Sequence, residues 1–129
     1  MSKLEMGLGL FPTEPPKQIV ETVQLAEELG YTHAWIGDSQ LIWREAYVNL
    51  GAAGLATSRI TLAQGVTNPI TRHATVTASA LATLSELTGG RVALGIGAGD
   101  SSVETFGKRP ARLSRLRDTV GTIRGLLAG

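Results

Sequence analysis

The chain has 129 residues, a length typical of one domain, and we expect residues 1–129 to form a single α/β domain. Its 12 Lys and Arg residues against 11 Asp and Glu residues give a formal net charge of +1, which is too small for a dedicated nucleic-acid-binding protein. The absence of cysteine excludes disulfide scaffolds, thiolate metal sites and cysteine nucleophiles.

The first part of the chain alternates between strand and helix patterns. Residues 4–10 are predicted to form a strand. A helix follows from about Pro16, because proline suits a first helical turn, and it ends near Gly30, which suits a left-handed cap. The next strand is predicted over about residues 33–37. A second helix over about residues 43–57 is rich in alanine and glycine, which allows close packing on a sheet.

The second part of the chain repeats this alternation. A third strand is predicted over residues 60–66, and a helix from about Arg72 to Leu87 is stopped by the pair Gly89–Gly90. A fourth strand is predicted over residues 91–96. The last helix is expected to bury a stripe of apolar residues that recur at spacings of three and four: Leu113, Leu116, Val120, Ile123 and Leu127.

Four strand–helix units in succession predict a parallel sheet. A closed (β/α)₈ barrel needs about 250 residues, so the chain is expected to hold a (β/α)₄ half of a TIM barrel. An open flavodoxin-like sheet that binds a phosphorylated ligand is a second interpretation, since four strand–helix units are also compatible with that fold.

Ligands of parallel α/β proteins bind at the carboxyl ends of the strands, so the residues that follow each strand are candidate site residues. The run Gly95–Asp100 does not complete a G-x-G-x-x-G dinucleotide motif, because its last position is Asp. A strand end with few side chains nevertheless allows a flat ligand to approach the backbone. Polar or glycine residues follow every predicted strand: Phe11–Pro12, Asp38–Gln40, Gly65–Pro69 and Gly97–Ser102.

Individual polar residues allow two interpretations. Asp38 and Asp100 are each either a ligand or acid–base group or the N-cap of the following helix. His33 and His73 are predicted to be structural, because one opens a strand and the other starts a helix. The two histidines and the dispersed carboxylates form no metal-ligand spacing, so no metal site is predicted.

No apolar run approaches the ~18 residues that a membrane-spanning helix needs, and residues Met1–Glu5 lack the pattern of a signal peptide. We therefore expect a cytoplasmic protein without membrane or nucleic-acid partners.

Taken together, three motifs resemble the luciferase-like flavin and deazaflavin oxidoreductases, a (β/α)₈ family of the bacterial luciferase superfamily. The motifs are Ala34–Asp38, Gly65–His73 and Leu87–Asp100. They are most similar to the subgroup of methylenetetrahydromethanopterin reductases that depend on coenzyme F420, a deazaflavin. The resemblance covers all 129 residues as the N-terminal half of a longer family chain.

The resemblance implies hydride transfer between a small-molecule substrate and a deazaflavin, coenzyme F420, with FMN as the alternative. It also implies a non-proline cis peptide bond at Gly65–Val66, behind the coenzyme ring. Asp38 and Asp100 are the expected catalytic residues. Ser39 stands where sugar-phosphate dehydrogenase members have histidine, which argues against that substrate. The expected coenzyme-binding residues are Asp38, Ser39, Gly65, Val66, Thr67, Asn68, Gly97, Ala98, Gly99 and Asp100.

A half-barrel would expose the inner face of its sheet and two strand edges. These edges predict a homo-oligomer in which copies of the chain pair with one another. The alternative to an oxidoreductase of this kind is a truncated or engineered half-barrel fragment that self-assembles and catalyses nothing. The flavodoxin-like alternative would lack the cis bond at Gly65–Val66.

Overall fold

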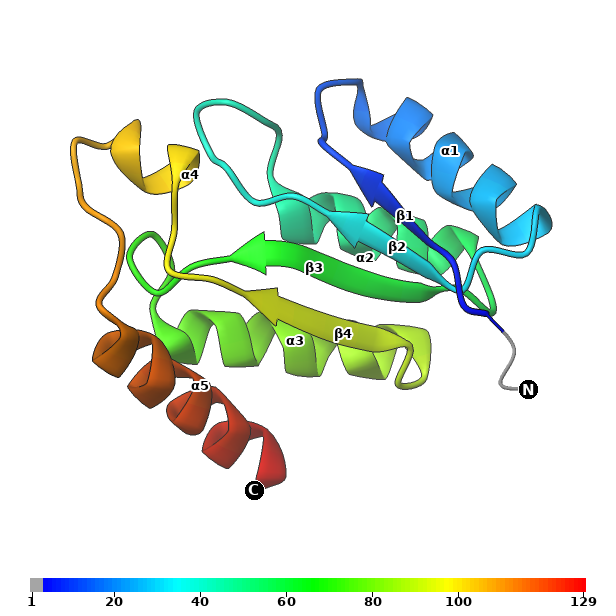
Figure 1. Ribbon diagram of the computed structural model, residues 1–129. Helices are drawn as coiled ribbons and strands as arrows, with labels where there is room; N and C mark the ends of the chain where they lie inside the picture. Colours follow the sequence, from blue (N-terminus) through cyan, green and yellow to red (C-terminus); the bar gives the residue numbers. More distant parts are fainter. Residues whose placement is uncertain (1–3) are drawn as a thin grey trace.

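The computed structural model describes residues 4–129, and in them four parallel strands form one sheet with the main helices packed on one face (Figure 1). The strands are β1 (Gly7–Leu10), β2 (His33–Ile36), β3 (Thr61–Thr67) and β4 (Val92–Ile96). The helices are α1 (Pro16–Glu28), α2 (Ala46–Ala56), α3 (Ala74–Thr88), α4 (Ser101–Glu104) and α5 (Leu113–Ala128). The predicted parallel (β/α)₄ architecture is confirmed.

The strand order in the sheet, β1-β2-β3-β4, follows the order of the chain. Helix α1 packs beside α2, and α2 packs beside α3, so each unit lies next to its predecessor. A flavodoxin-like sheet has the order 2-1-3-4-5. The flavodoxin-like alternative is therefore wrong, and the arrangement is that of one half of a TIM barrel.

The main core lies between the sheet and the helices. Side chains of a strand alternate between its two faces, and in β2 it is Ala34 and Ile36 that point to the helices and are fully buried. They pack with Leu62 of β3, Val23 of α1 and Leu50 of α2, which are equally buried. This burial of apolar area supplies the main driving force for folding.

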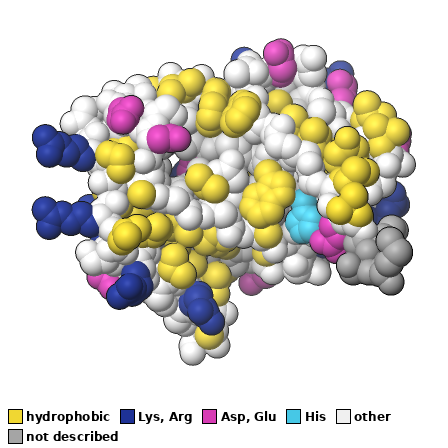
Figure 2. All heavy atoms as spheres, in the orientation of Figure 1, with side chains coloured by type: hydrophobic (Ala, Val, Ile, Leu, Met, Phe, Trp, Pro, Cys, Tyr) yellow, Lys and Arg dark blue, Asp and Glu magenta, His cyan; other side chains and the backbone are white. Residues whose placement is uncertain are grey.

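On the other face of the sheet, Trp35 lies across a floor of glycines. A Cβ atom added to Gly7 of β1 or to Gly65 of β3 would lie 3.0 Å from atoms of the Trp35 side chain, and one added to Gly95 of β4 would lie 3.3 Å from its ring. The His33 ring stacks on the indole at a centroid distance of 6.1 Å. Figure 2 shows this face, with hydrophobic side chains over the sheet and most charged side chains around the rim. The close packing of the Trp35 indole therefore explains why β1, β3 and β4 carry glycine at these positions.

Several boundaries differ from the predictions. The second helix begins at Ala46, because the Glu45 side chain caps it by accepting a hydrogen bond from the backbone N–H of Val48. The first strand begins at Gly7. Residues 1–3 lie outside the described residues, and part of the prediction for Met1–Glu5 falls on them. The short helix α4 was not predicted.

The predicted core stripe of the last helix is confirmed only in its middle, where Ile123 is buried and Leu116 and Val120 are half-buried. Of its five residues, Ile123 is the one buried in the described structure, whereas Leu113 is 78% exposed and Leu127 is 47% exposed. Helix α5 packs mainly against α3, so much of its apolar face has no neighbour within residues 4–129. Within the same residues no helix is long and apolar enough to cross a bilayer.

Glu27 ties the end of α1 to the turn before β3. Its carboxylate accepts hydrogen bonds from the backbone N–H groups of Ser58, Arg59 and Ile60, at 3.1, 2.6 and 2.7 Å. Partial burial on its own would raise the pKa of Glu27, but these N–H groups and the Arg59 guanidinium outweigh it, and the pKa lies below its ordinary value of 4.5.

A carboxylate whose pKa is lowered by folding stabilises the protein above its unfolded pKa and loses that effect as the pH falls through its folded pKa. We therefore expect Glu27→Gln to lower the free energy of unfolding at pH 7 and to have a smaller effect at about pH 3.5. Urea unfolding at both pH values measures this, with the exposed neighbour Glu28 changed to Gln as the control. An equal loss of unfolding free energy at both pH values would contradict a lowered pKa of Glu27.

Candidate active site

The carboxyl ends of the strands surround a cleft of about 330 Å³, which is within the usual range of small-molecule sites. All ten residues expected to bind a coenzyme line this cleft: Asp38, Ser39, Gly65, Val66, Thr67, Asn68, Gly97, Ala98, Gly99 and Asp100. The structure thus brings them together, while their roles toward a coenzyme remain predictions.

A bulge at the end of β3 shapes one wall of the cleft. Gln64 pairs with Leu94 and Thr67 pairs with Ile96, so β3 carries one residue more than β4 between these pairs. The Gly65–Val66 peptide bond in the bulge is cis, as the resemblance implies. The Val66 side chain is 54% exposed and lies next to Gly97, where an added Cβ would be 3.5 Å from it.

Glycines at and after the end of β4 leave the backbone bare, and two of them, Gly97 and Gly99, line the cleft. A Cβ atom at Gly95 would lie 2.8 Å from the backbone oxygen of Gln64, which is closer than real Cβ contacts. Gly99 has a φ of +101°, and a Cβ there would lie 2.3 Å from the Val103 side chain. Both positions therefore require glycine, and the bare backbone predicted for this strand end is confirmed.

Asp38 is buried at the end of β2, with 4% of its surface exposed, and its carboxylate is fully engaged. The Thr67 hydroxyl donates a hydrogen bond to Oδ2 at 2.7 Å. The guanidinium of Arg72 donates from Nε to Oδ2 at 2.6 Å and from Nη2 to Oδ1 at 3.0 Å. These charge-assisted bonds lock the ends of β2 and β3 to the start of α3.

Arg72 extends this cluster away from the cleft. Its Nη2 also donates to the Glu45 carboxylate, and its Cζ lies 4.8 Å from the centre of the Tyr47 ring. Burial alone would lower the pKa of Arg72, but the carboxylates of Asp38 and Glu45 raise it above its ordinary value. Arg72 is therefore a permanent cation that bridges two acidic partners.

Asp100 is in a different environment from Asp38. It is exposed at the mouth of the cleft, and its carboxylate accepts a hydrogen bond from the Ser101 hydroxyl at 3.1 Å. The N-cap alternative is wrong for Asp38, because Glu45 caps α2. Asp100 occupies the N-cap position of α4, but its side chain makes no capping hydrogen bond there. Its carboxylate is thus the one of the two that is accessible from the cleft.

Two further polar side chains in the cleft differ in whether their hydrogen-bonding groups have partners. The Asn68 amide donates to Thr71 and Ser102, each at 2.9 Å, and its oxygen accepts from the N–H groups of Ile70 and Thr71. Asn68 therefore has no free hydrogen-bonding capacity, and it fixes the loop after β3 to α4. The buried Ser39 hydroxyl, in contrast, has no partner in the described structure.

Four further residues line the cleft outside the set expected to bind a coenzyme: Phe11, Trp43, Ser101 and Ser102. The Phe11 and Trp43 rings stack at a centroid distance of 4.7 Å and form an aromatic wall, for which Gly37 leaves room. Phe11 follows β1 directly, and this position at a strand end is the sequence feature that could have identified it as a cleft residue. The histidines are structural, as predicted, since His33 stacks on Trp35 and His73 caps α3.

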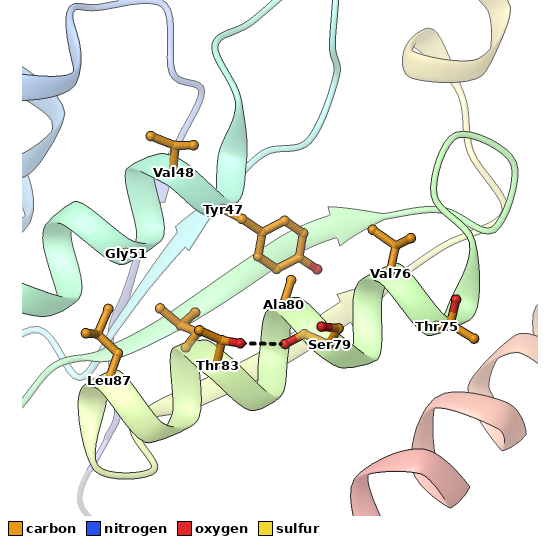
Figure 3. Close-up of a pocket in the computed structure, with 10 residues that line it drawn as sticks. Tyr47, Val48, Gly51, Thr75, Val76, Ser79, Ala80, Thr83 and Leu87 are labelled. Atoms are coloured by element: carbon orange, nitrogen blue, oxygen red, sulfur yellow. Dashed lines mark hydrogen bonds between the residues drawn. The ribbon is translucent and has the colours of Figure 1, made fainter.

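A larger hollow of about 570 Å³ lies between α2 and α3 (Figure 3). None of its ten lining residues is Asp, Glu, Lys, Arg or His. We assign the candidate active site to the smaller cleft, because ionisable and glycine residues from several strand ends converge there. Within residues 4–129, no three His, Asp or Glu side chains are grouped to hold a metal ion.

Comparisons with known proteins give consistent results. Residues 4–129 match the model of a family described as luciferase-like monooxygenase. The chain is 35% identical over 130 residues to a 5,10-methylenetetrahydromethanopterin reductase of Methanolobus tindarius, covering 98% of this chain and 39% of that protein. It is 34% identical over 125 residues to an F420-dependent hydroxymycolic acid dehydrogenase of Mycobacterium tuberculosis, covering 88% of this chain and 35% of that protein.

A solved structure of a coenzyme F420-dependent tetrahydromethanopterin reductase from Methanopyrus kandleri has a similar fold. The TM-score is 0.86 at 30% sequence identity, and the match covers 95% of this chain and 40% of the other. The chain thus spans about two fifths of the length of the proteins that it matches.

Proposed function

Because the chain belongs to the luciferase-like monooxygenase family, we propose that its strand-end cleft binds the ring of a deazaflavin, coenzyme F420, in an oxidoreductase that transfers hydride to or from a small molecule. The observation that carries this proposal is the convergence of all ten expected binding residues on one cleft. Two of the relatives described above are named as F420-dependent, which supports the deazaflavin over FMN.

Three features of the cleft fit a planar, polar-edged ring. The backbone at Gly97, which lines the cleft, lets a flat group approach closely, and an added Cβ atom would fill part of that space. The buried hydroxyl of Ser39 lacks a partner in the described structure, so a ligand atom can supply one. Val66 and the Phe11–Trp43 pair add apolar surface on which a ring can pack.

When bound, the deazaflavin would supply the chemistry of hydride transfer. The residues of this chain orient the reactants. Asp38, held by Thr67 and Arg72, keeps the ends of β2 and β3 in a fixed arrangement around the bulge. In this proposal the exposed carboxylate of Asp100 takes up or gives the proton that accompanies hydride transfer.

We further propose that copies of the chain associate through the open face and edges of the sheet. The edge strands β1 and β4 each have one neighbouring strand within residues 4–129, so each leaves backbone groups for further pairing. Two such sheets supply eight strands, the number in a closed barrel. This association would cover Trp35 and place additional groups around the cleft.

The test is a fluorescence titration of the 129-residue protein with coenzyme F420 and with FMN, with the oligomeric state of the same sample read by sedimentation. We expect saturable binding, with tighter binding of the deazaflavin. We also expect Gly97→Ala to weaken binding about tenfold or more, because its methyl group would make an ordinary 3.5 Å contact with Val66 while occupying the cleft floor.

Gly121→Ala is the matched control, since nothing lies within 4 Å of that position on α5. It should leave coenzyme affinity unchanged. Absence of binding by the parent protein to either coenzyme would contradict the proposal and favour the catalytically inactive fragment. Equal affinities of the Gly97→Ala variant and its parent would place the ring elsewhere.

A further inference from the structure

Basic side chains are concentrated in the loop between α4 and α5 and in the first turns of α5. Residues 105–117, the basic segment, contain five of the 12 Lys and Arg residues of the chain and no Asp or Glu. The five are exposed: Lys108, Arg109, Arg112, Arg115 and Arg117. None of them takes part in an ion pair within residues 4–129. The basic segment therefore carries a positive charge that no ion pair of the described structure balances.

A backbone hydrogen bond fastens the basic segment to the wall of the strand-end cleft. The N–H group of Ala111 donates to the backbone oxygen of Ala98 at 2.8 Å, and Ala98 lines the cleft. Arg112 follows Ala111 directly, and Arg109 lies two residues before it. Both arginines are thus within about 8 Å of Ala111, because consecutive Cα atoms are about 3.8 Å apart.

A second hydrogen bond fastens the basic segment to the loop after β3. The Arg115 guanidinium donates to the backbone oxygen of Pro69 at 2.9 Å, and Pro69 follows the cleft residue Asn68. Figure 2 shows Lys and Arg side chains on the side of the molecule toward which the strands point in Figure 1. The basic segment and the cleft therefore share one edge of the sheet, and a molecule bound in the cleft can extend to these cations.

The positions of the cations do not stabilise the helix that carries them. Arg112 is the N-cap residue of α5 and makes no capping hydrogen bond, and Arg115 lies in the first turn. The N-terminus of a helix has a partial positive charge, so cations are unfavourable there. Neighbouring like charges also repel one another. An anion from outside the described structure would relieve both effects.

The chemistry of the basic segment selects phosphate and carboxylate groups, since guanidinium groups bind both through paired hydrogen bonds. The adjacent cleft also has a group in need of a ligand, because the buried Ser39 hydroxyl has no partner in the described structure. Coenzyme F420 joins a deazaflavin ring to a phosphate and a chain of glutamate residues. A ring in the cleft would leave this anionic chain free to run over the strand ends.

We propose that the basic segment binds the anionic chain of the coenzyme whose ring occupies the cleft. This inference rests on the proposed function and adds a second site outside the cleft. Attraction between exposed charges is screened by salt, and the Debye length falls from about 10 Å at 0.1 M to about 3 Å at 1 M. The contribution of the chain to affinity is therefore expected to fall over this range of salt.

Fluorescence titrations with two probes separate the two sites. The probes are coenzyme F420 and its deazaflavin nucleoside, which lacks the phosphate and the glutamate chain. We expect the parent protein to bind coenzyme F420 more tightly. The double variant Arg109→Gln/Arg112→Gln should bind coenzyme F420 about tenfold more weakly at 0.1 M salt, since each exposed ion pair changes affinity by about threefold. Its affinity for the nucleoside should equal that of the parent.

The matched control is Arg59→Gln/Arg124→Gln, which removes two charges at exposed positions outside the basic segment. It should bind coenzyme F420 like the parent, and circular dichroism of both variants checks that the fold is retained. The nucleoside 5′-phosphate is a third probe. If the parent binds it as tightly as coenzyme F420, the phosphate makes the contact. If the parent binds it like the nucleoside, the glutamate carboxylates make the contact.

Loss of affinity for coenzyme F420 alone, in the Arg109→Gln/Arg112→Gln variant alone, supports the inference. Equal losses for coenzyme F420 and the nucleoside overturn it and show that the basic segment supports the cleft itself. Affinity for coenzyme F420 that is unchanged in this variant also overturns it, while binding of both probes leaves the proposed function standing. A parent protein that binds neither probe overturns the proposed function and this inference together.

Discussion

Arg91→Met is expected to lower the free energy of unfolding by about 4 kcal/mol, because it removes a whole group of hydrogen bonds at once. The Arg91 guanidinium donates to the backbone oxygens of Thr88, Ile60, Gly54 and Thr57, at distances of 3.0, 2.7, 3.0 and 3.0 Å. It also contacts the Thr57 hydroxyl at 3.3 Å. One side chain thus joins the ends of α2 and α3 to the start of β3.

A hydrogen bond to a charged group contributes about 1.5–3 kcal/mol, and such contributions do not add fully within one network. Methionine keeps most of the length of the side chain, so the loss reports the hydrogen bonds more than the packing. Urea unfolding measures it. Arg91→Lys keeps the charge but not the planar fork, and we expect an intermediate loss. The control is Arg124→Met, at an exposed position on α5. If Arg91→Met lowers the free energy of unfolding no more than this control does, the hydrogen bonds of Arg91 do not contribute as expected.

The second large effect is expected for Arg72→Met, which removes the cation beside Asp38. Breaking a buried ion pair from one side costs about 3–5 kcal/mol, because the remaining charge is left without a partner. The Asp38 side chain is 2% exposed and that of Arg72 is 17% exposed, so we expect the lower end, about 3 kcal/mol.

The double variant Arg72→Met/Asp38→Asn separates the ion pair from general packing. The asparagine amide would be neutral, and its oxygen could still accept the hydrogen bond from Thr67, so the double variant should be more stable than Arg72→Met alone. A double-mutant cycle in urea gives the coupling energy. Strictly additive losses would mean that the two side chains act independently, contrary to their 2.6 Å contact.

The sequence was sufficient to predict the elements of the sheet and the residues that meet at its carboxyl edge. Apolar runs ended by glycine mark the strands and helices, and the left-handed φ of 65° at Gly89 is what stops α3. Once the strands are known to be parallel, their carboxyl ends must lie at one edge. For this reason Asp38, Gly65 and Gly97 could be brought together without knowledge of any side-chain contact.

Other features depend on geometry that a sequence pattern does not carry. Arg72 lies 34 residues from Asp38, and no periodic spacing within one helix or strand reveals that pair. The stripe on α5 has a core-like period, yet Leu113 is 78% exposed, because periodicity describes a face and not what covers it. Phe11 stayed outside the expected coenzyme-binding set because its stacking partner Trp43 comes from a different loop.

The placement of the two tryptophans gives this protein two separate optical reporters. Trp43 stacks on Phe11 in the wall of the cleft, whereas Trp35 lies over glycines on the open face of the sheet. A ligand that enters the cleft reaches the first indole, and a copy of the chain that covers the sheet reaches the second. The emission of one chain therefore responds to both occupancy of the cleft and assembly, without any added label.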